Sequence, residues 1–135
     1  TRTAEIFAAE KIIVPDIKVK KMDNFKSISV GAEDWVEIEE CKEADLLPWL
    51  KARKNEGYSI IGIEQTSSSQ CLSKVQFEEK SILLLGKEKE GIPVEFLQVV
   101  DKCVEIPQLG IIRSLNVHVS GAISIWEYTK QMMIQ

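Results

Sequence analysis

Two short segments of the chain carry residues whose types and spacing could do chemistry. The first, "LLLGKEKEGIP" at residues 83–93, places Gly86 directly after an apolar run, followed by Glu88 and Gly91. A glycine at the end of a strand lets a ligand or another stretch of backbone approach closely. A Walker phosphate loop needs Ser or Thr after Gly-Lys, where this chain has Glu88, and no GxGxxG pattern is present. A ligand loop and a plain strand–helix turn therefore both stay open.

The second segment, "LGIIRSLNVHVS" at residues 109–120, sets polar side chains among apolar neighbours where the last predicted helix begins. Ser114 and Asn116 are residue types that accept hydrogen bonds from the first N–H groups of a helix. The same side chains could serve a substrate or cofactor, so capping and function are both open. His118 is the only histidine, and no acid–base partner for it is visible in the sequence, which favours a structural role.

Cysteine usage argues against metal or disulfide chemistry. Cys41, Cys71 and Cys103 are far apart, and no pair has the CxxC spacing of a zinc site. Three is also an odd number, which does not suit a disulfide framework and favours a reducing compartment. We therefore expect no metal site and an intracellular location, cytoplasmic or nuclear.

The composition fits one ordinary globular domain. Of the 135 residues, 44% are hydrophobic and 28% are charged, which excludes a disordered chain. The net charge of -4 argues against a free-standing nucleic-acid binder, although a catalytic domain could rely on another region to grip RNA. No apolar run approaches the roughly 20 residues that span a bilayer, so we expect no membrane association.

Apolar runs and helix breakers predict alternating strands and helices. The nearly uniform run "KSILLLG" is typical of a parallel strand that is covered on both faces. The fold class is therefore α/β, with a mostly parallel sheet and helices on both faces. Trp35 is expected on the inner side of an edge strand, and Pro48 in the first turn of a helix, where proline is tolerated. We predict strands within residues 11–16, 34–41, 58–65, 80–86 and 102–108, and helices over 2–10, 43–57, 92–101 and 116–133.

Taken together, these segments resemble the SpoU (TrmH-type) branch of the SPOUT methyltransferases. "LGKEKEGIP" and "IPQLGIIRSLNVHVSGAISIWE" resemble the second and third motifs of that family, and "RTAEIFAAEKIIV" resembles the end of the first. "GAEDWVEI" also matches a segment common in the family, so the resemblance covers nearly the whole chain. It implies a SPOUT fold with a deep C-terminal trefoil knot, a feature otherwise nearly absent from proteins.

The resemblance also implies a cofactor and its site. Members of the family bind S-adenosylmethionine in the knot, in a bent conformation and largely through backbone groups. Carried over by motif, Gly86, Ile106 and Leu115 are expected to contact the cofactor. Glu64, at the end of the strand "SIIGIE", is a further expected contact.

The implied reaction is methyl transfer to a ribose 2'-oxygen of RNA, with tRNA guanosine-18 as the target that the resemblance suggests. The matching catalytic set is Arg2, Glu88, Ser114 and Asn116. An arginine is almost never deprotonated in proteins, so we expect Arg2 to position the ribose and its phosphate and to stabilise the emerging alkoxide. Glu88, Ser114 and Asn116 are expected to orient the arginine and to shape the loops.

Two expectations concern assembly and extent. The family dimerises through its last helix, which here carries more apolar residues than one face needs; these are Val117, Val119, Ile123, Ile125, Trp126, Met132 and Met133. The family also has an Asn several residues before the arginine that Arg2 matches, and this chain starts one residue before Arg2. We therefore interpret residues 1–135 as a SpoU domain truncated at its N-terminal end, able to bind cofactor but methylating tRNA poorly or not at all.

Two alternatives stay open. The chain could be an RNA-binding SPOUT module that has kept the fold and lost the activity, although Glu88, Ser114 and Asn116 favour an enzyme. It could also be a nucleotide-binding α/β oxidoreductase, against which the missing GxGxxG pattern counts. A structured RNA, tRNA or another, is the expected partner in both SPOUT readings.

Overall fold

The computed structural model describes residues 1–18, 31–86, 90–112 and 115–134. Helices and strands alternate along these residues, and every strand pair between them is parallel, which confirms the predicted α/β class. The chain forms two compact units, residues 1–49 and residues 50–135.

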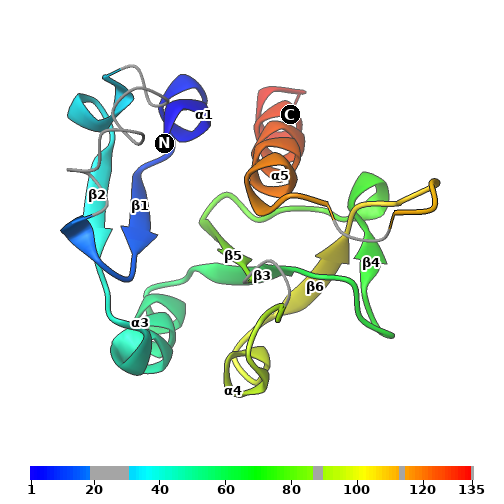
Figure 1. Ribbon diagram of the computed structural model, residues 1–135, viewed down its shortest axis with the longest axis horizontal. Helices are drawn as coiled ribbons and strands as arrows, with labels where there is room; N and C mark the ends of the chain where they lie inside the picture. The colour runs from blue at the N-terminus through cyan, green and yellow to red at the C-terminus, as the bar shows by residue number, and fades with distance from the viewer. Residues whose placement is uncertain (19–30, 87–89, 113–114, 135) are drawn as a thin grey trace. The chain divides into compact units, whose positions relative to one another are not determined.

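The first unit holds a two-stranded sheet of β1 (Lys11–Val14) and β2 (Glu37–Glu40), with α1 (Arg2–Ile6) and the 3-10 turn η2 (Ala32–Asp34) (Figure 1). The ammonium of Lys11 lies 3.2 Å from a carboxylate oxygen of Glu39, whose other oxygen accepts a hydrogen bond from the indole N–H of Trp49. Both carboxylate oxygens of Glu39 thus have partners within the unit.

Two predictions for this unit are wrong in detail. The helix predicted over residues 2–10 ends at Ile6, because Ala8 adopts a left-handed backbone with φ +56° that no helix can continue. Trp35 precedes β2 and is 81% exposed, while its neighbour Val36 is buried. The short strand therefore begins after the tryptophan, which leaves the indole outside the alternation that the sequence pattern indicated.

Helix α3 (Glu43–Asn55) crosses from the first unit to the second. Pro48 lies inside this helix rather than in its first turn, so that prediction is wrong as well. Leu50 is almost completely buried, and the helix ends in Arg53 and Lys54, whose positive charges suit a helix C-terminus. Lys54 forms an ion pair of 3.0 Å with Asp101, and Asp101 accepts a hydrogen bond from the N–H of Ile60.

The second unit is built on a four-stranded parallel sheet in the order β4-β6-β3-β5. Three of its strands match the predicted ones closely, whereas the two-residue β4 lies outside every predicted strand. The elements are β3 (Ser59–Ile63), β4 (Gln70–Cys71), β5 (Ser81–Leu85), β6 (Lys102–Glu105), the 3-10 turn η3 (Leu72–Lys74), α4 (Val94–Leu97) and α5 (Val117–Ile134).

Helices cover both faces of this sheet, as predicted (Figure 1). Alternate residues of β3 point to opposite faces. Ile61 and Ile63 belong to the core on which Tyr128 and Met132 of α5 pack. Gly62 faces the other way, where an added Cβ would lie 3.1 Å from Ile92, next to α4.

Side-chain hydrogen bonds attach the end of α5 to the segment before β5. The carboxamide of Gln131 accepts from the N–H of Phe77 and donates to the carbonyl of Val75, at 2.9 and 2.8 Å. The Tyr128 hydroxyl donates to the carbonyl of Glu79, and its ring meets Phe77 edge to face. These contacts fix the last helix over the sheet. Among the described residues no helix is long and apolar enough to cross a membrane.

Candidate functional site

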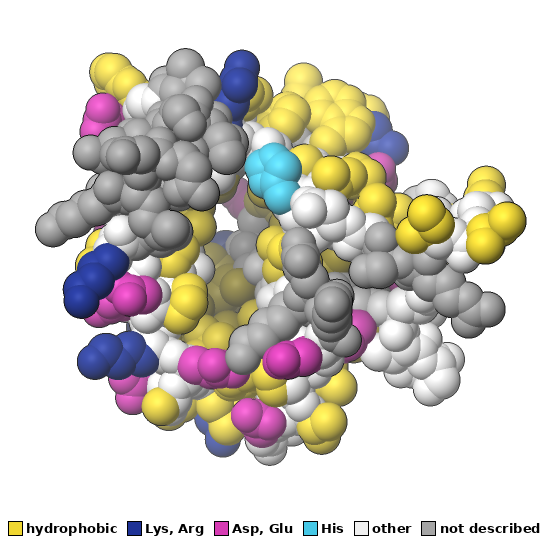
Figure 2. Space-filling model, in the orientation of Figure 1, with side chains coloured by type: hydrophobic (Ala, Val, Ile, Leu, Met, Phe, Trp, Pro, Cys, Tyr) yellow, Lys and Arg dark blue, Asp and Glu magenta, His cyan; other side chains and the backbone are white. Residues whose placement is uncertain are grey.

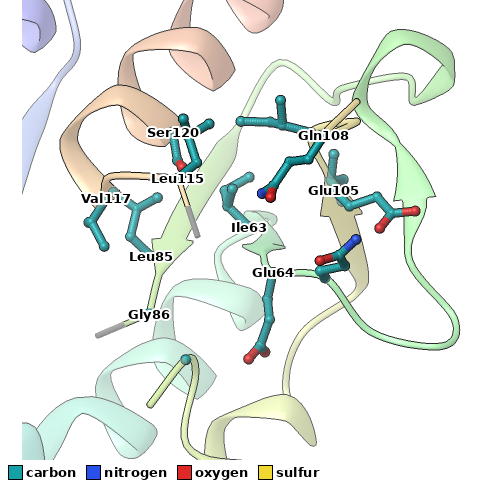
Figure 3. A pocket seen from close by; sticks show the side chains of 13 residues that line it. Ile63, Glu64, Leu85, Gly86, Glu105, Gln108, Leu115, Val117 and Ser120 are labelled. Carbon is teal, nitrogen blue, oxygen red and sulfur yellow. The ribbon is translucent and has the colours of Figure 1, made fainter. Parts of the chain in front are cut away.

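A cavity of about 160 Å³ lies at the carboxyl ends of β3, β5 and β6 in the second unit. Open parallel sheets bind their ligands at this edge, where the strands end and the loops begin. Figure 3 shows the side chains from the start of α5 on one side of the cavity and Glu64 on the other. The lining residues are Ile63, Glu64, Gln65, Leu85, Gly86, Gly91, Val104, Glu105, Ile106, Gln108, Leu115, Val117 and Ser120.

The structure brings all four predicted cofactor contacts to this one cavity. Glu64 follows β3, Gly86 follows β5, Ile106 follows β6, and Leu115 precedes α5. The four residues come from separate segments, so nothing in their spacing required them to meet. Ile106 and Leu115 bring apolar side chains to it and Gly86 brings backbone alone, as expected of a site that holds a ligand through main-chain groups between apolar side chains.

Gly86 has no room for a side chain, and the reason is another stretch of backbone. A Cβ built on Gly86 would lie 2.5 Å from the carbonyl carbon of Gly91 and 2.7 Å from the nitrogen of Ile92. Contacts below 3.0 Å force one partner to move, and here the partner is main chain. The sequence left open whether a ligand or backbone needs the glycine; backbone passes against it, directly beside the cavity.

Glu64 holds that same backbone. One carboxylate oxygen, Oε1, accepts a hydrogen bond of 3.1 Å from the N–H of Ile92. The other, Oε2, is buried and has no hydrogen-bond partner among the described residues. Buried polar atoms are nearly always paired, so an unpaired carboxylate oxygen beside a cavity suits a ligand that brings an N–H or O–H donor.

Charge in the cavity has one sign among its described lining residues. Glu64 and Glu105 are both acidic, and no lysine or arginine lines the cavity with them. A ligand that carries positive charge fits such a wall better than a phosphate does.

Asn116 is the N-cap of α5. Its side-chain oxygen accepts hydrogen bonds from the N–H groups of His118 and Val119, at 2.9 and 3.2 Å, and its carbonyl accepts from Ser120. The prediction that Asn116 caps this helix is therefore confirmed. The amide nitrogen of the side chain has no part in this cap, which leaves room for a second role. His118 is exposed at the same helix end, and Figure 2 colours the histidine cyan.

The other predicted catalytic residues are distributed over different parts of the chain. Arg2 is the first residue of α1, in the unit of residues 1–49, and its side chain is exposed. Glu88 and Ser114 lie outside the described residues. The described residues that line the cavity all fall within residues 63–120.

Several lining residues were missed by the sequence analysis. Gln65 and Glu105 stand at the carboxyl ends of β3 and β6, a position that is itself a usable signal in a parallel sheet. Ser120 lies one turn into α5 from Asn116, and helical spacing puts residues four apart on one face. Gln108 carries no such signal, because it belongs to an irregular segment.

The described residues offer no competing metal or thiol chemistry at this edge. They contain no group of three or more His, Cys, Asp or Glu side chains that could hold a metal ion. Burial raises the pKa of the Cys103 thiol, and the nearby charge of Glu64 raises it further, so this thiol stays protonated near neutral pH.

Comparison with known proteins gives matches over nearly the whole chain. The model of the SpoU rRNA Methylase family matches residues 1–126. The tRNA (guanosine(18)-2'-O)-methyltransferase TARBP1 of Mus musculus is 50% identical over 133 residues, which are 98% of this chain and 8% of the relative. The tRNA (guanosine(18)-2'-O)-methyltransferase of Saccharomyces cerevisiae is 40% identical over 98% of this chain and 9% of its own length. The chain thus spans less than a tenth of these two curated relatives.

Solved structures share the fold. The TrmH/SpoU tRNA modifying enzyme of A. aeolicus superposes with a TM-score of 0.85 at 26% identity, covering 98% of this chain and 66% of that one. An rRNA methyltransferase of Sinorhizobium meliloti, solved with AdoMet bound, gives a TM-score of 0.85 at 22% identity, over 97% and 49% of the two chains.

Proposed function

Because the chain belongs to the SpoU rRNA methylase family, we propose that it is the methyltransferase domain of an S-adenosylmethionine-dependent tRNA ribose 2'-O-methyltransferase, with guanosine-18 as the target nucleotide. The family membership confirms the resemblance found in the motifs. The motifs also predict a likeness to the C-terminal domain of TAR RNA-binding protein, and TARBP1 of Mus musculus is among the matches. The observation that carries the proposal is the meeting of Glu64, Gly86, Ile106 and Leu115 at one cavity.

The residues around the cavity fit this cofactor. When bound, S-adenosylmethionine supplies a methyl group on a positively charged sulfonium. Glu64 and Glu105 give the wall the opposite sign of charge, and Oε2 of Glu64 is an acceptor without a partner among the described residues. Backbone N–H and C=O groups after β5 and β6, beside the apolar side chains of Ile106 and Leu115, can hold an adenine ring. No lining residue in the described segments would oppose a cation.

The chain's own residues then divide the work as the resemblance implies. Arg2 holds the ribose and its phosphate and stabilises negative charge that develops on the 2'-oxygen. Asn116 fixes the first turn of α5 beside the cavity, and with Glu88 and Ser114 it shapes the loops around the acceptor. Correct placement of oxygen and methyl group supplies much of such a rate enhancement, because little covalent chemistry falls to the protein.

The finer features of the family complete the proposal. We propose that the segment before α5 passes through a loop as the deep trefoil knot of the SPOUT fold, that the partner is tRNA or another structured RNA, and that the protein acts in the cytoplasm or nucleus. The joint lining of one cavity by Gly86, Ile106 and Leu115 supports this, because it brings the segment before α5 beside the loop after β5.

Cofactor binding tests the proposal most directly. We expect titration calorimetry to show saturable binding of S-adenosylhomocysteine, the reaction product, and no binding of NAD. The full-length protein should also transfer a tritiated methyl group from S-adenosylmethionine to tRNA. Binding without transfer by the full-length protein would favour the inactive RNA-binding module, and binding of NAD alone would favour an oxidoreductase.

A second part of the proposal concerns the self-association of the protein. Figure 2 shows hydrophobic side chains gathered over α5. Four exposed apolar residues of this helix share one helical face by their spacing: Val119 (40% exposed), Ile123 (38%), Trp126 (48%) and Met133 (73%). A soluble helix usually covers such a face, so we propose a two-fold dimer through α5.

We expect light scattering to give the mass of a dimer at micromolar concentration, and Trp126→Glu to shift it to the monomer. Val94→Glu is a matched control, because Val94 is 81% exposed on α4 and away from this face. A wild-type monomer in the presence of S-adenosylhomocysteine would contradict the proposed dimer.

A further inference from the structure

The Gly91–Ile92 backbone is held against the sheet by one long-range side chain. Glu64 follows β3 directly, and its own N–H donates to the carbonyl of Val104 in β6, so the base of the side chain is fixed to the sheet. From there its carboxylate accepts the N–H of Ile92, 28 residues further along the chain. The two residues thus connect the ends of β3 and β5 across the rim of the cavity.

The local geometry of the turn depends on this contact. Gly91 has φ +70°, a left-handed backbone that side chains disfavour, and a Cβ there would lie 2.1 Å from Oε1 of Glu64. The same backbone also lies against Gly86, where again there is no space for a Cβ. The Gly91–Ile92 backbone is therefore held between the Glu64 carboxylate and Gly86, and Glu64, Gly86 and Gly91 all line the cavity.

We propose that Glu64 is a positioning residue, which holds the Gly91–Ile92 backbone in place before any ligand binds and so builds one wall of the cavity in advance. This role rests on the proposed function only where cofactor affinity is concerned, and it is separate from the direct cofactor contact expected of Oε2. A wall that is already in place costs a ligand less ordering when it binds.

Three substitutions at Glu64 distinguish the effect of its side-chain length from the effect of its negative charge. Glu64→Gln keeps the length of the side chain and an oxygen that can accept from Ile92. Glu64→Asp keeps the charge and shortens the reach, and Glu64→Ala removes the acceptor. Glu105→Ala is the matched control, because Glu105 lines the same cavity from the neighbouring strand β6. If Glu64 acts by position, the Ile92 amide should exchange in Glu64→Gln much as in the wild type, and in Glu64→Asp much as in Glu64→Ala.

The decisive readout is hydrogen exchange of the Ile92 amide in the cofactor-free protein, followed by NMR. We expect exchange about tenfold faster or more in Glu64→Ala and Glu64→Asp, and a change of less than about threefold in Glu64→Gln and Glu105→Ala. The amide of Glu64 itself, bonded to Val104, serves as an internal reference for an intact sheet. Unaltered exchange at Ile92 in a folded Glu64→Ala variant overturns the proposal.

Cofactor titration on the same preparations gives the second readout. S-adenosylhomocysteine should bind about tenfold more weakly to Glu64→Ala than to the wild type, and Glu64→Gln should recover at least half of that loss on a logarithmic scale. Equal affinities of Glu64→Gln and Glu64→Ala for S-adenosylhomocysteine would overturn the proposed link between the position of the Gly91–Ile92 backbone and cofactor affinity. If the wild type binds no cofactor while Ile92 still responds to the substitutions, the proposed function fails and the positioning role stands. If Glu64→Ala does not fold, the comparison of Glu64→Gln with Glu64→Asp in the same two measurements tests the proposal.

Discussion

Replacing Gly86 by valine is expected to weaken the binding of S-adenosylhomocysteine by about tenfold or more, which corresponds to about 1.4 kcal/mol. The side chain would have to occupy space that the Gly91–Ile92 backbone fills, at 2.5 to 2.8 Å from the Cβ position. That backbone forms a wall of the cavity, so moving it changes the shape of the site. Calorimetry with S-adenosylhomocysteine measures the loss, and thermal unfolding shows whether the variant is folded.

The same geometry predicts how the effect depends on side-chain size. The conflict begins at the Cβ itself, so Gly86→Ala should already give most of the loss that Gly86→Val gives. Gly110→Val is a suitable control, since a Cβ on Gly110 meets no atom within 4 Å. An alanine variant with wild-type affinity would mean that the Gly91–Ile92 backbone accommodates a Cβ here, and the expected conflict would be wrong.

The parts of the fold that the sequence predicted well are those with long, uniform patterns. The apolar runs of β3 and β5 and the eighteen-residue helix α5 were found near their true bounds, whereas the mixed sequence of β6 gave its start but not its end. Short or exposed elements have no such pattern. The two residues of β4 carry too few side chains to show periodicity, and the end of α1 depends on the left-handed Ala8, which no propensity favours.

The sequence predicted several residues of the site, but not the contacts between them. Motif resemblance named Glu64, Gly86, Ile106 and Leu115, and the cavity contains all four. No local pattern could show that Glu64 bonds the N–H of Ile92, because that contact depends on the strand order β6-β3-β5. Tertiary neighbours likewise decided the role of Gly86, whereas the cap formed by Asn116 is local and was read from residue type alone.

The largest effect is expected at Arg2. In the full-length protein, Arg2→Ala should lower methyl transfer to tRNA by about a thousandfold or more, roughly 4 kcal/mol, as when a group that stabilises developing charge is removed. Affinity for S-adenosylhomocysteine should change by less than about twofold, because the cavity is formed by residues 63–120 and Arg2 belongs to α1. An exposed guanidinium is free to meet the ribose and phosphate of an RNA.

Two further variants test the chemistry assigned to this arginine. Arg2→Lys keeps the positive charge and loses the planar fork that binds phosphate at two points, so its activity should fall between those of the wild type and Arg2→Ala. Lys51→Ala removes an exposed cation from α3 and should transfer methyl groups at close to the wild-type rate. The measurements are tritiated-methyl incorporation and cofactor titration on the same preparations. If Arg2→Ala keeps wild-type turnover, or loses cofactor binding together with activity, then Arg2 does not serve the ribose.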